Sequence, residues 1–436
     1  MYRLDEIERG LADAQSGERQ ALSRSDRLLS HALVEYAADQ HRPAPQNRIT
    51  YIDPQLAPSP PAPAALLASA SRSPAATLQA IARMHPLYEQ LRAGLAWYRV
   101  RYGSLPQLTL PPGPNLAPGS KGDRVRLLRQ RLGVPAASGD PARYDAALGS
   151  AVREFRKVHG LGDAAVADAE TIAALNAGPA FYESVILTNL DRVRGLPAAP
   201  GRRYLLVDTA GARLSLYEGG QLRDTMRVIV GKPEMQTPQL AGLVRFAMLN
   251  PYWNIPPDLV RANIAPKVLA EGPGYLASRE YEALSDWSES ARVLRPDEID
   301  WRAVANGALA LRMRQRPGGD NMMGRIKFMF PNRFGIYLHD TPKKELFAEP
   351  DRHLSSGCIR LEDAARLGRW IFGHPVVVPA GSVATESRLD IPEPMPLYVI
   401  HLTARPEGGE IRFQKDVYGR DLAATTRWAS ARPAAQ

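Results

Sequence analysis

The chain has 436 residues, of which 44% are hydrophobic and 23% charged, and its formal net charge is +9 at pH 7. This length and composition predict a globular protein of two to four domains, and no run of about 18 apolar residues suggests a membrane span. The single cysteine excludes an internal disulfide framework, and the eight histidines show no metal-binding spacing, so neither a metal nor a cofactor is expected.

The excess of positive charge fits either an anionic partner or a solvated, arginine-rich surface. Because no long Lys/Arg block occurs, we do not expect a nucleic-acid partner. The first residues, MYRLDEIERG, lack the apolar segment of a signal peptide. We therefore expect a cytosolic protein or a mature or trimmed form of an exported one.

A helical scaffold is predicted over residues 1–115. Apolar residues recur at helical spacing over 24–40 and again over about 74–101. The Pro-rich segment 42–64 between them cannot hold a long helix. A linker rich in proline and glycine follows at 104–123.

A compact unit of three short helices is predicted over residues 116–180. Asp123 and Asp168 are suited to cap the first and third helices. Leu148, Val152 and Phe155 line one face of the second. Gly178 and Pro179 are expected to end the unit.

The pattern changes to period two near residue 200, and a strand-rich domain is predicted over 200–405. A helical and loop-like insert interrupts it at about 256–313. Its apolar residues at helical spacing need a surface to cover, so we expect a lid over a nearby cleft. A decoration on the far side of the domain is the alternative. Residues 406–436 are expected to form a C-terminal strand and a tail.

The only cysteine, Cys358, lies in the sequence Ser355-Ser356-Gly357-Cys358-Ile359-Arg360. A thiol attacks as thiolate and therefore needs a base or a positive neighbour. His339 and Tyr337 alternate with apolar residues in a strand-like segment and should point into one space. Gly357 permits close approach of a substrate, and Arg360 could bind a carboxylate or lower the thiol pKa. The alternative is a buried cysteine that acts as a small hydrophobe.

These motifs resemble a known family. The segments H-D-T-P (339–342) and S-S-G-C-I-R (355–360) resemble the catalytic motif of L,D-transpeptidases with a YkuD domain, and the large YcbB-type members are the more similar ones. Further similar segments are VGKPEMQTP (230–238), NPYWNIPP (250–257), RQRPGGDNMMGRIKFMFPN (314–332) and VYGRD (417–421). Residues 116–180 resemble a peptidoglycan-binding type 1 module, although an anonymous three-helix bundle remains the alternative.

The resemblance implies a multidomain α+β protein with a YkuD-type β-sandwich catalytic domain. Cys358 would be the nucleophile and His339 its base. Tyr337, Gly357 and Arg360 match positions associated with the site, and together with Ser356 they are expected to bind the substrate or the oxyanion. Backbone amides near Gly357 and Cys358 would hold that oxyanion. Members of the family often have histidine where Ser356 stands. A second histidine, five residues before the cysteine at His353, is a weaker rival for the base.

The resemblance also implies a function and partners. The enzyme would form peptidoglycan cross-links between diamino acid residues through a thioester, with stem peptides as donor and acceptor. Carbapenems would inhibit it, and it would work in the periplasm or cell envelope. An L,D-carboxypeptidase or another wall-peptide hydrolase on the same fold, a non-catalytic wall-binding scaffold, and a cytosolic thiol hydrolase remain alternatives.

Overall fold

The computed structural model describes residues 4–136, 139–286, 288, 290–376 and 386–421. The chain divides into two compact units. The first contains residues 1–201, 208–211 and 399–436, and the second contains 202–207 and 212–398. The described C-terminal residues, 399–421, are thus grouped with the N-terminal helices.

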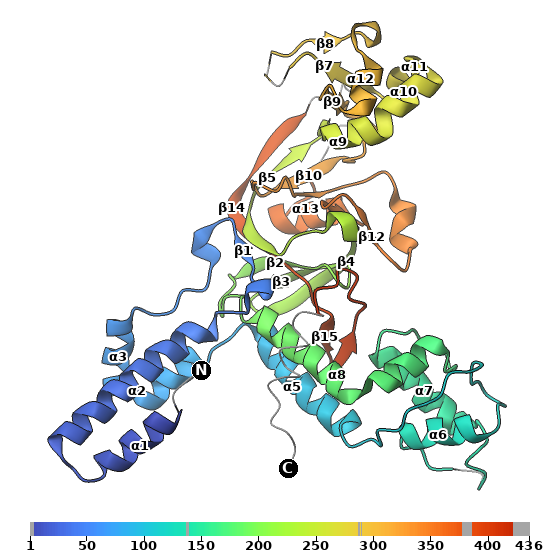
Figure 1. Cartoon of the computed structure of the whole chain (residues 1–436). Coiled ribbons are helices and arrows are strands. Elements are labelled where there is room, and N and C mark those ends of the chain that lie inside the picture. Colours follow the sequence, from blue (N-terminus) through green and yellow to red (C-terminus); the bar gives the residue numbers. More distant parts are fainter. Residues whose placement is uncertain (1–3, 137–138, 287, 289, 377–385, 422–436) are drawn as a thin grey trace. The chain divides into compact units, whose positions relative to one another are not determined.

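The first unit is mostly helical (Figure 1). None of its helices, nor any other helix in the described ranges, combines the length and apolarity that crossing a membrane requires. Its elements are α1 (Leu4–Ala14), α2 (Arg19–Gln40), β1 (Thr50–Tyr51), α3 (Pro63–Arg72), α4 (Pro74–Ile81), α5 (Pro86–Tyr102), α6 (Asp123–Arg131), α7 (Ala146–Val158), α8 (Ala169–Val193), β15 (Ala404–Glu407) and β16 (Glu410–Phe413).

The predicted helix at 24–40 is present and begins earlier, whereas the pattern at 74–101 belongs to two helices, α4 and α5. The interruption has a local cause. Pro86 has no backbone N–H and takes the first position of α5, while the buried ring of His85 accepts a hydrogen bond from the Leu87 amide at 3.2 Å. A proline is favoured at a helix start and disfavoured in its interior.

Three helices follow where the sequence predicts them. Asp168 caps α8, with its side chain accepting from the Thr171 amide, whereas Asp123 is the first residue of α6 rather than its cap, which is Gly122. Gly178 has a non-helical φ of 79° inside α8, so the helix is broken where the sequence predicts an end. The chain nevertheless continues directly into a second helical segment that ends at Val193.

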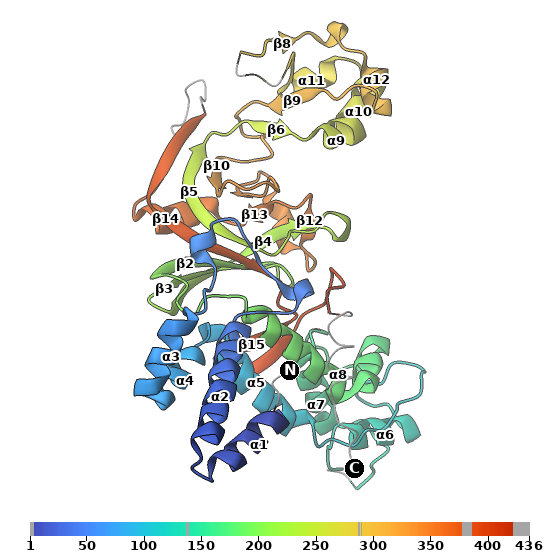
Figure 2. The same cartoon turned by 60° about the vertical axis from the view of Figure 1, so that its left-hand side comes forward.

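The C-terminal hairpin β15–β16 packs on α5 and α8, and Figure 2 shows β15 beside α5. The hairpin lies so close to α5 that a Cβ on Gly94 would meet the Ile411 side chain at 2.4 Å. Phe413 stacks on the ring of His159, with the centroids 5.3 Å apart. A larger residue at Gly94 would therefore push the hairpin away from α5.

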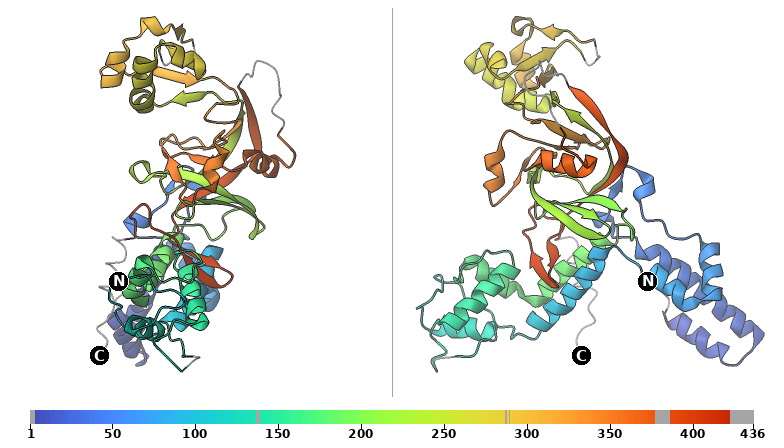
Figure 3. Two further views of the ribbon diagram at one scale, coloured as in Figure 1. Left: turned by 90° about the vertical axis from the view of Figure 1, so that its right-hand side faces the viewer. Right: turned by 180° about the vertical axis from the view of Figure 1, so that it is seen from behind.

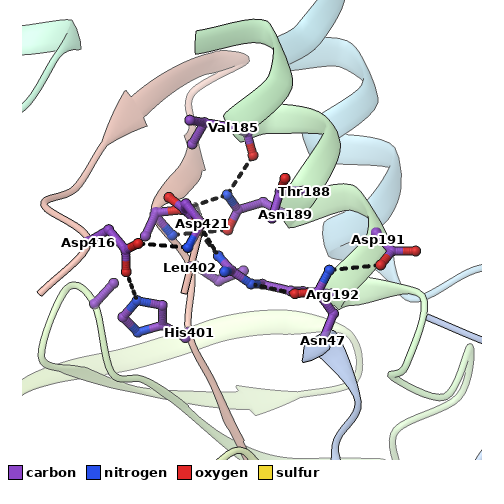
Figure 4. A network of polar contacts seen from close by, with 12 residues as sticks. Asn47, Val185, Thr188, Asn189, Asp191, Arg192, His401, Leu402, Asp416 and Asp421 are labelled. Atoms are coloured by element: carbon purple, nitrogen blue, oxygen red, sulfur yellow. Dashed lines mark hydrogen bonds and ion pairs between the residues drawn. The ribbon is translucent and has the colours of Figure 1, made fainter. Parts of the chain in front are cut away.

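A buried polar network joins this hairpin region to α8 and to the N-terminal segment (Figure 4). Arg192 is fully buried, and its guanidinium contacts Asp421 at 2.8 Å, Thr403 at 3.2 Å and Asn47 at 3.2 Å. His401 contacts Asp416 at 3.0 Å in the same network. Burial lowers the pKa of His401 to about 4, so this ring is neutral at pH 7.

We expect Arg192→Met to destabilise the first unit by about 3–5 kcal/mol, because the Asp421 carboxylate would stay buried without its cation. As a control, Arg405→Met removes an exposed pair with Glu407 and should cost less than about 1 kcal/mol. Hydrogen exchange of the α8 amides under increasing urea measures both. Equal effects of the two variants would contradict a structural role for the buried pair.

The second unit is built around a mixed sheet with strand order β5-β10-β11-β13-β4-β3-β2-β14, with β12 paired to β4. Because β14 also pairs with β5, the pairing closes on itself, and the β-sandwich expected from the resemblance is not confirmed. The elements are β2 (Arg203–Asp208), β3 (Arg213–Glu218), β4 (Gln221–Gly231), β5 (Leu240–Leu249), β10 (Ile326–Met329), β11 (Leu338–His339), β12 (His353–Ser355), β13 (Ile359–Leu361), α13 (Ala364–Phe372) and β14 (Ser387–Ile400).

The insert is a small body with a sheet of its own, drawn in yellow and gold in Figure 3. The strand order is β6-β9-β7-β8, so the expectation of helices and loops alone is wrong. The missed strands are two to four residues long, too short for a period of two to be recognised. Its elements are β6 (Trp253–Ile255), α9 (Pro257–Leu259), a π-helical turn (Val260–Ile264), α10 (Ala265–Glu271), α11 (Gly274–Ser278), β7 (Tyr281–Leu284), β8 (Val293–Leu294), α12 (Trp301–Asn306) and β9 (Arg312–Gln315).

The apolar residues of the insert pack into its own core. Val260, Ile264 and Val268 are buried there against Met313 and Val304. The sequence argument that these residues need an external cleft to cover is therefore wrong. The insert begins and ends on paired strands, since Trp253 lies opposite Gln315.

Candidate active site

Two short parallel strands bring the predicted site residues together. In the pairing of β11 with β13, Leu338 lies opposite Ile359 and His339 opposite Arg360. The Ile359 amide donates to the Tyr337 carbonyl at 3.0 Å, so Cys358 lies level with Tyr337. Because residues opposite each other in a sheet share a face, His339 and Arg360 project to the same side.

The backbone around Cys358 is fixed by hydroxyl groups. Gly357 has a φ of 111°, a conformation that favours glycine, and its carbonyl accepts from the Thr237 hydroxyl at 2.7 Å. The Ser355 hydroxyl donates to the Cys358 carbonyl at 2.6 Å and accepts from the Gly357 amide at 3.1 Å. Of the two amides expected to hold an oxyanion, the one on Gly357 is therefore already engaged. The Cys358 amide has no hydrogen-bond partner among the described residues.

His339 is buried and held in one orientation. Its side chain is 2% exposed, and its Nδ1 lies 2.5 Å from the Asp340 carbonyl oxygen. An N–H at Nδ1 leaves Nε2 as the acceptor, which is the form that a general base requires. Burial, with a further contribution from Arg360, lowers the pKa of His339 to about 3.

Asp340 orients the histidine through its carbonyl and not through its carboxylate, as the strand alternation predicts. The carboxylate accepts from the Arg325 amide at 2.9 Å and from the Lys344 ammonium at 2.6 Å. Lys344 also donates to the Glu362 carbonyl at 2.8 Å, which ties the end of β11 to the segment after β13. A Cβ on Gly324 would meet the Asp340 carboxylate at 2.3 Å, so only glycine fits there.

The thiol of Cys358 is half-buried, and its Sγ lies 3.5 Å from the Gly335 carbonyl. Burial raises its pKa, although Tyr337, Arg360 and Lys327 oppose that effect. With His339 neutral as well, the resting pair is a thiol and an imidazole and not a thiolate–imidazolium pair. The chemistry that suits it is attack coupled to proton removal.

We expect alkylation of Cys358 by iodoacetamide to rise with pH around a midpoint above the ordinary cysteine value of about 8.5, because burial disfavours the thiolate. His339 stays neutral far below its ordinary pKa of about 6.5, so its protonation should cause no loss of reaction near that pH. Mass spectrometry reports the rate without background, since no other cysteine exists in the chain. A midpoint below neutral pH would instead indicate a preformed ion pair.

The other predicted site residues are Tyr337, Ser356 and His353. The Tyr337 and His339 rings are 5.6 Å apart at an edge-to-face angle, and burial raises the pKa of Tyr337. Ser356 is exposed. His353 lies on β12, paired with β4, and its ring is 2.6 Å from the Asp351 carboxylate.

One residue of the site was missed at the sequence level. Lys327 lies directly opposite His339 in the pairing of β10 with β11, and its ammonium is 5.1 Å from the centre of the Tyr337 ring. The signal was a lysine within an otherwise apolar strand pattern, I-K-F-M-F, where a polar residue should face solvent or a site.

No group of three or more side chains suited to hold a metal occurs in the described ranges.

Two segments of the chain match known protein families. Residues 202–378 match the L,D-transpeptidase catalytic domain known as YkuD, and residues 2–95 match a scaffold domain. Residues 202–378 therefore form a YkuD-type L,D-transpeptidase catalytic domain. Cys358 and His339 both lie within the matched segment 202–378.

Similar proteins carry the same family name. A Haemophilus influenzae protein (strain ATCC 51907 / DSM 11121 / KW20 / Rd) named "Putative L,D-transpeptidase" is 32% identical over 240 residues, which are 53% of this chain. The chain spans about half the length of that relative, 47%.

Among solved structures, the L,D-transpeptidase from Xylanimonas cellulosilytica is 18% identical, with 66% of this chain and 99% of that one covered and a TM-score of 0.22. An L,D-transpeptidase in complex with imipenem is 13% identical, with coverages of 46% and 59% and a TM-score of 0.22. At these TM-scores the structural likeness carries no argument about ligands.

Proposed function

We propose that this protein is a peptidoglycan L,D-transpeptidase that cross-links diamino acid residues by cysteine acyl transfer. Cys358 is the nucleophile and His339 the general base. The observation that carries the proposal is the placement of a thiol and an orientated, neutral imidazole on adjacent parallel strands within a YkuD domain. The donor is a tetrapeptide stem, and the acceptor is the side-chain amine of a second stem.

In the first step the sulfur attacks the carbonyl carbon at the L-centre of the third residue, and His339 takes the thiol proton at Nε2. The Cys358 amide is the backbone donor left to hold the oxyanion. The C–N bond to D-alanine then breaks, and His339 returns the proton to the departing nitrogen. A thioester remains on Cys358.

In the second step the acceptor amine attacks the thioester. His339 takes a proton from this amine, the C–S bond breaks, and the proton returns to the sulfur. One amide is exchanged for another, so the reaction needs no nucleotide. This energy balance suits an enzyme of the periplasm or cell envelope, and we place the protein there.

The test is incubation of the purified chain with a tetrapeptide donor and an amine acceptor, followed by mass analysis. Cross-linked product together with released D-alanine is the expected result. D-alanine release with tripeptide alone would indicate the L,D-carboxypeptidase alternative. Neither product, with Cys358 unmodified, would indicate the non-catalytic scaffold.

Two further parts of the chain fit this function. The helical unit of α6–α8 has a groove of about 630 Å³ lined by Arg143, Tyr144, Ser150 and Arg153, and we propose that it binds peptidoglycan strands.

Carbapenems are expected to acylate Cys358, because a reactive lactam presents the same kind of carbonyl to the thiol.

The insert is proposed to act as a lid that limits the access of water to the thioester. The insert follows β5, whose last residue, Leu249, pairs with Ile326 on β10. Ile326 precedes Lys327, and β10 is separated from β13 by β11 alone. Because β6 and β9 pair, a short linker can bridge the gap left by deleting 258–312.

We expect this deletion to raise the ratio of hydrolysis to cross-linking, since water would reach the thioester more easily. The donor–acceptor assay above measures the ratio, circular dichroism checks that the catalytic sheet is folded, and alkylation shows that Cys358 remains accessible. An unchanged ratio in a folded deletion variant would reject the lid.

A further inference from the structure

Two cations flank the nucleophile and its base across three neighbouring strands. Lys327 on β10 lies opposite His339 on β11, and His339 lies opposite Arg360 on β13. Residues opposite one another share a face of the sheet, so the three side chains form a row with the imidazole in the middle. Tyr337 and Cys358 lie level with each other, two residues before His339 and Arg360, and therefore on the same face.

Neither cation is paired with an anion in the part of the chain that the structure describes. Among the described residues, the Lys327 ammonium and the Arg360 guanidinium have neither a hydrogen bond nor an ion pair, and both side chains are half-buried. Lys327 contacts the Tyr337 ring and feels the negative charge of Glu386, an exposed residue whose carboxylate accepts from the Tyr252 amide at 3.0 Å. The carboxylate of Asp340, the residue after His339, is engaged by Lys344.

Such an arrangement costs free energy in the unliganded protein. Burial lowers the pKa of both Lys327 and Arg360, because a cation loses hydration without gaining an anion. Sites that keep two such groups are suited to an anionic ligand that supplies the missing partners. Lys327 and Arg360 lie two strands apart on either side of His339, which puts their Cα atoms about 10 Å from each other and suits two separate anions.

We propose that Lys327 and Arg360 each bind one of the two carboxylates that flank the scissile bond of the donor. The substrate class would then be a stem peptide whose third residue carries a free side-chain carboxylate, in addition to the carboxylate of the terminal D-alanine. This inference rests on the proposed function. It excludes donors with lysine, or with an amidated diamino acid, at the third position as efficient substrates.

The chemistry of the donor explains why two cations are needed. One carboxylate lies on the leaving D-alanine and the other on the acyl side, so they lie on opposite sides of the carbonyl that Cys358 attacks. Binding both fixes that carbonyl against the sulfur, which is the positioning that acyl transfer requires. If the cations served only to favour the thiolate, the identity of the donor would not matter.

The experiment uses four tetrapeptide donors with a diamino dicarboxylic acid at position three: unmodified, amidated on the side-chain carboxylate, amidated on the C-terminus, and amidated on both. The second-order rate of acylation of Cys358 is measured by intact mass for the unsubstituted enzyme, Lys327→Met and Arg360→Met. We expect the unsubstituted enzyme to disfavour each singly amidated donor by about tenfold or more. Each variant should lose the discrimination against one of the two, and Lys327→Arg should retain it.

Three outcomes would overturn the inference. The first is equal rates of the unsubstituted enzyme on free and amidated donors. The second is a uniform loss in Lys327→Met across all four donors, which would indicate an effect on the thiol alone. The third is loss of the same discrimination in both variants. Failure of the proposed function looks different, because no donor would then acylate Cys358 of the unsubstituted enzyme at all.

Discussion

Replacing Cys358 with alanine is expected to abolish acylation and turnover, with a loss on the order of 10³ or more. The thiol is the only sulfur nucleophile of its kind in the chain, and its backbone is held by Ser355 and Thr237 independently of the side chain. The fold should therefore survive the change. Intact mass after incubation with a carbapenem should show one adduct on the unsubstituted protein and none on the variant.

Cys358→Ser provides the matched control for this result. It keeps the size and a hydrogen-bonding group, but a hydroxyl is far harder to ionise than a thiol, and it should be nearly as inactive. Circular dichroism and thermal unfolding establish that both variants are folded. Turnover retained in either one would show that another group carries the acyl chain.

Replacing His339 with alanine is expected to slow acylation by a factor on the order of 10² or more. The effect should be large because both members of the resting pair are neutral, so that the thiol depends on removal of its proton during attack. Acylation by a carbapenem in a stopped-flow measurement gives the rate without the need for an acceptor. Raising the pH should partly restore the rate of the variant, since hydroxide ionises the thiol directly.

His353→Ala is the control for this prediction. His353 lies on β12, and its ring contacts the Asp351 carboxylate. Its removal should change the rate of acylation by less than about threefold and affect local stability instead. A larger loss of rate in His353→Ala than in His339→Ala would show that His353 is the base and would overturn the proposed mechanism.

Local sequence patterns determined much of the organisation of this chain. Period-two alternation and the positions of proline and glycine predicted where the strand-rich unit begins, and Asp168 and Gly178 marked the start and the break of α8. These signals are readable because they depend on backbone chemistry within a few residues. The motifs around His339 and Cys358 likewise predicted the YkuD catalytic domain, and the family match over 202–378 confirms it.

Only the tertiary structure decided what each site residue contacts. The Gly357 amide, expected to hold the oxyanion, is engaged by Ser355, and Lys327 joins the site because β10 pairs beside β11. The apolar helix of the insert faces its own core, since short strands that no periodicity reveals complete that core. Strand pairing and burial join residues far apart in the chain, and they also set the pKa values of Cys358 and His339. A local sequence pattern therefore gives neither these long-range contacts nor the pKa values.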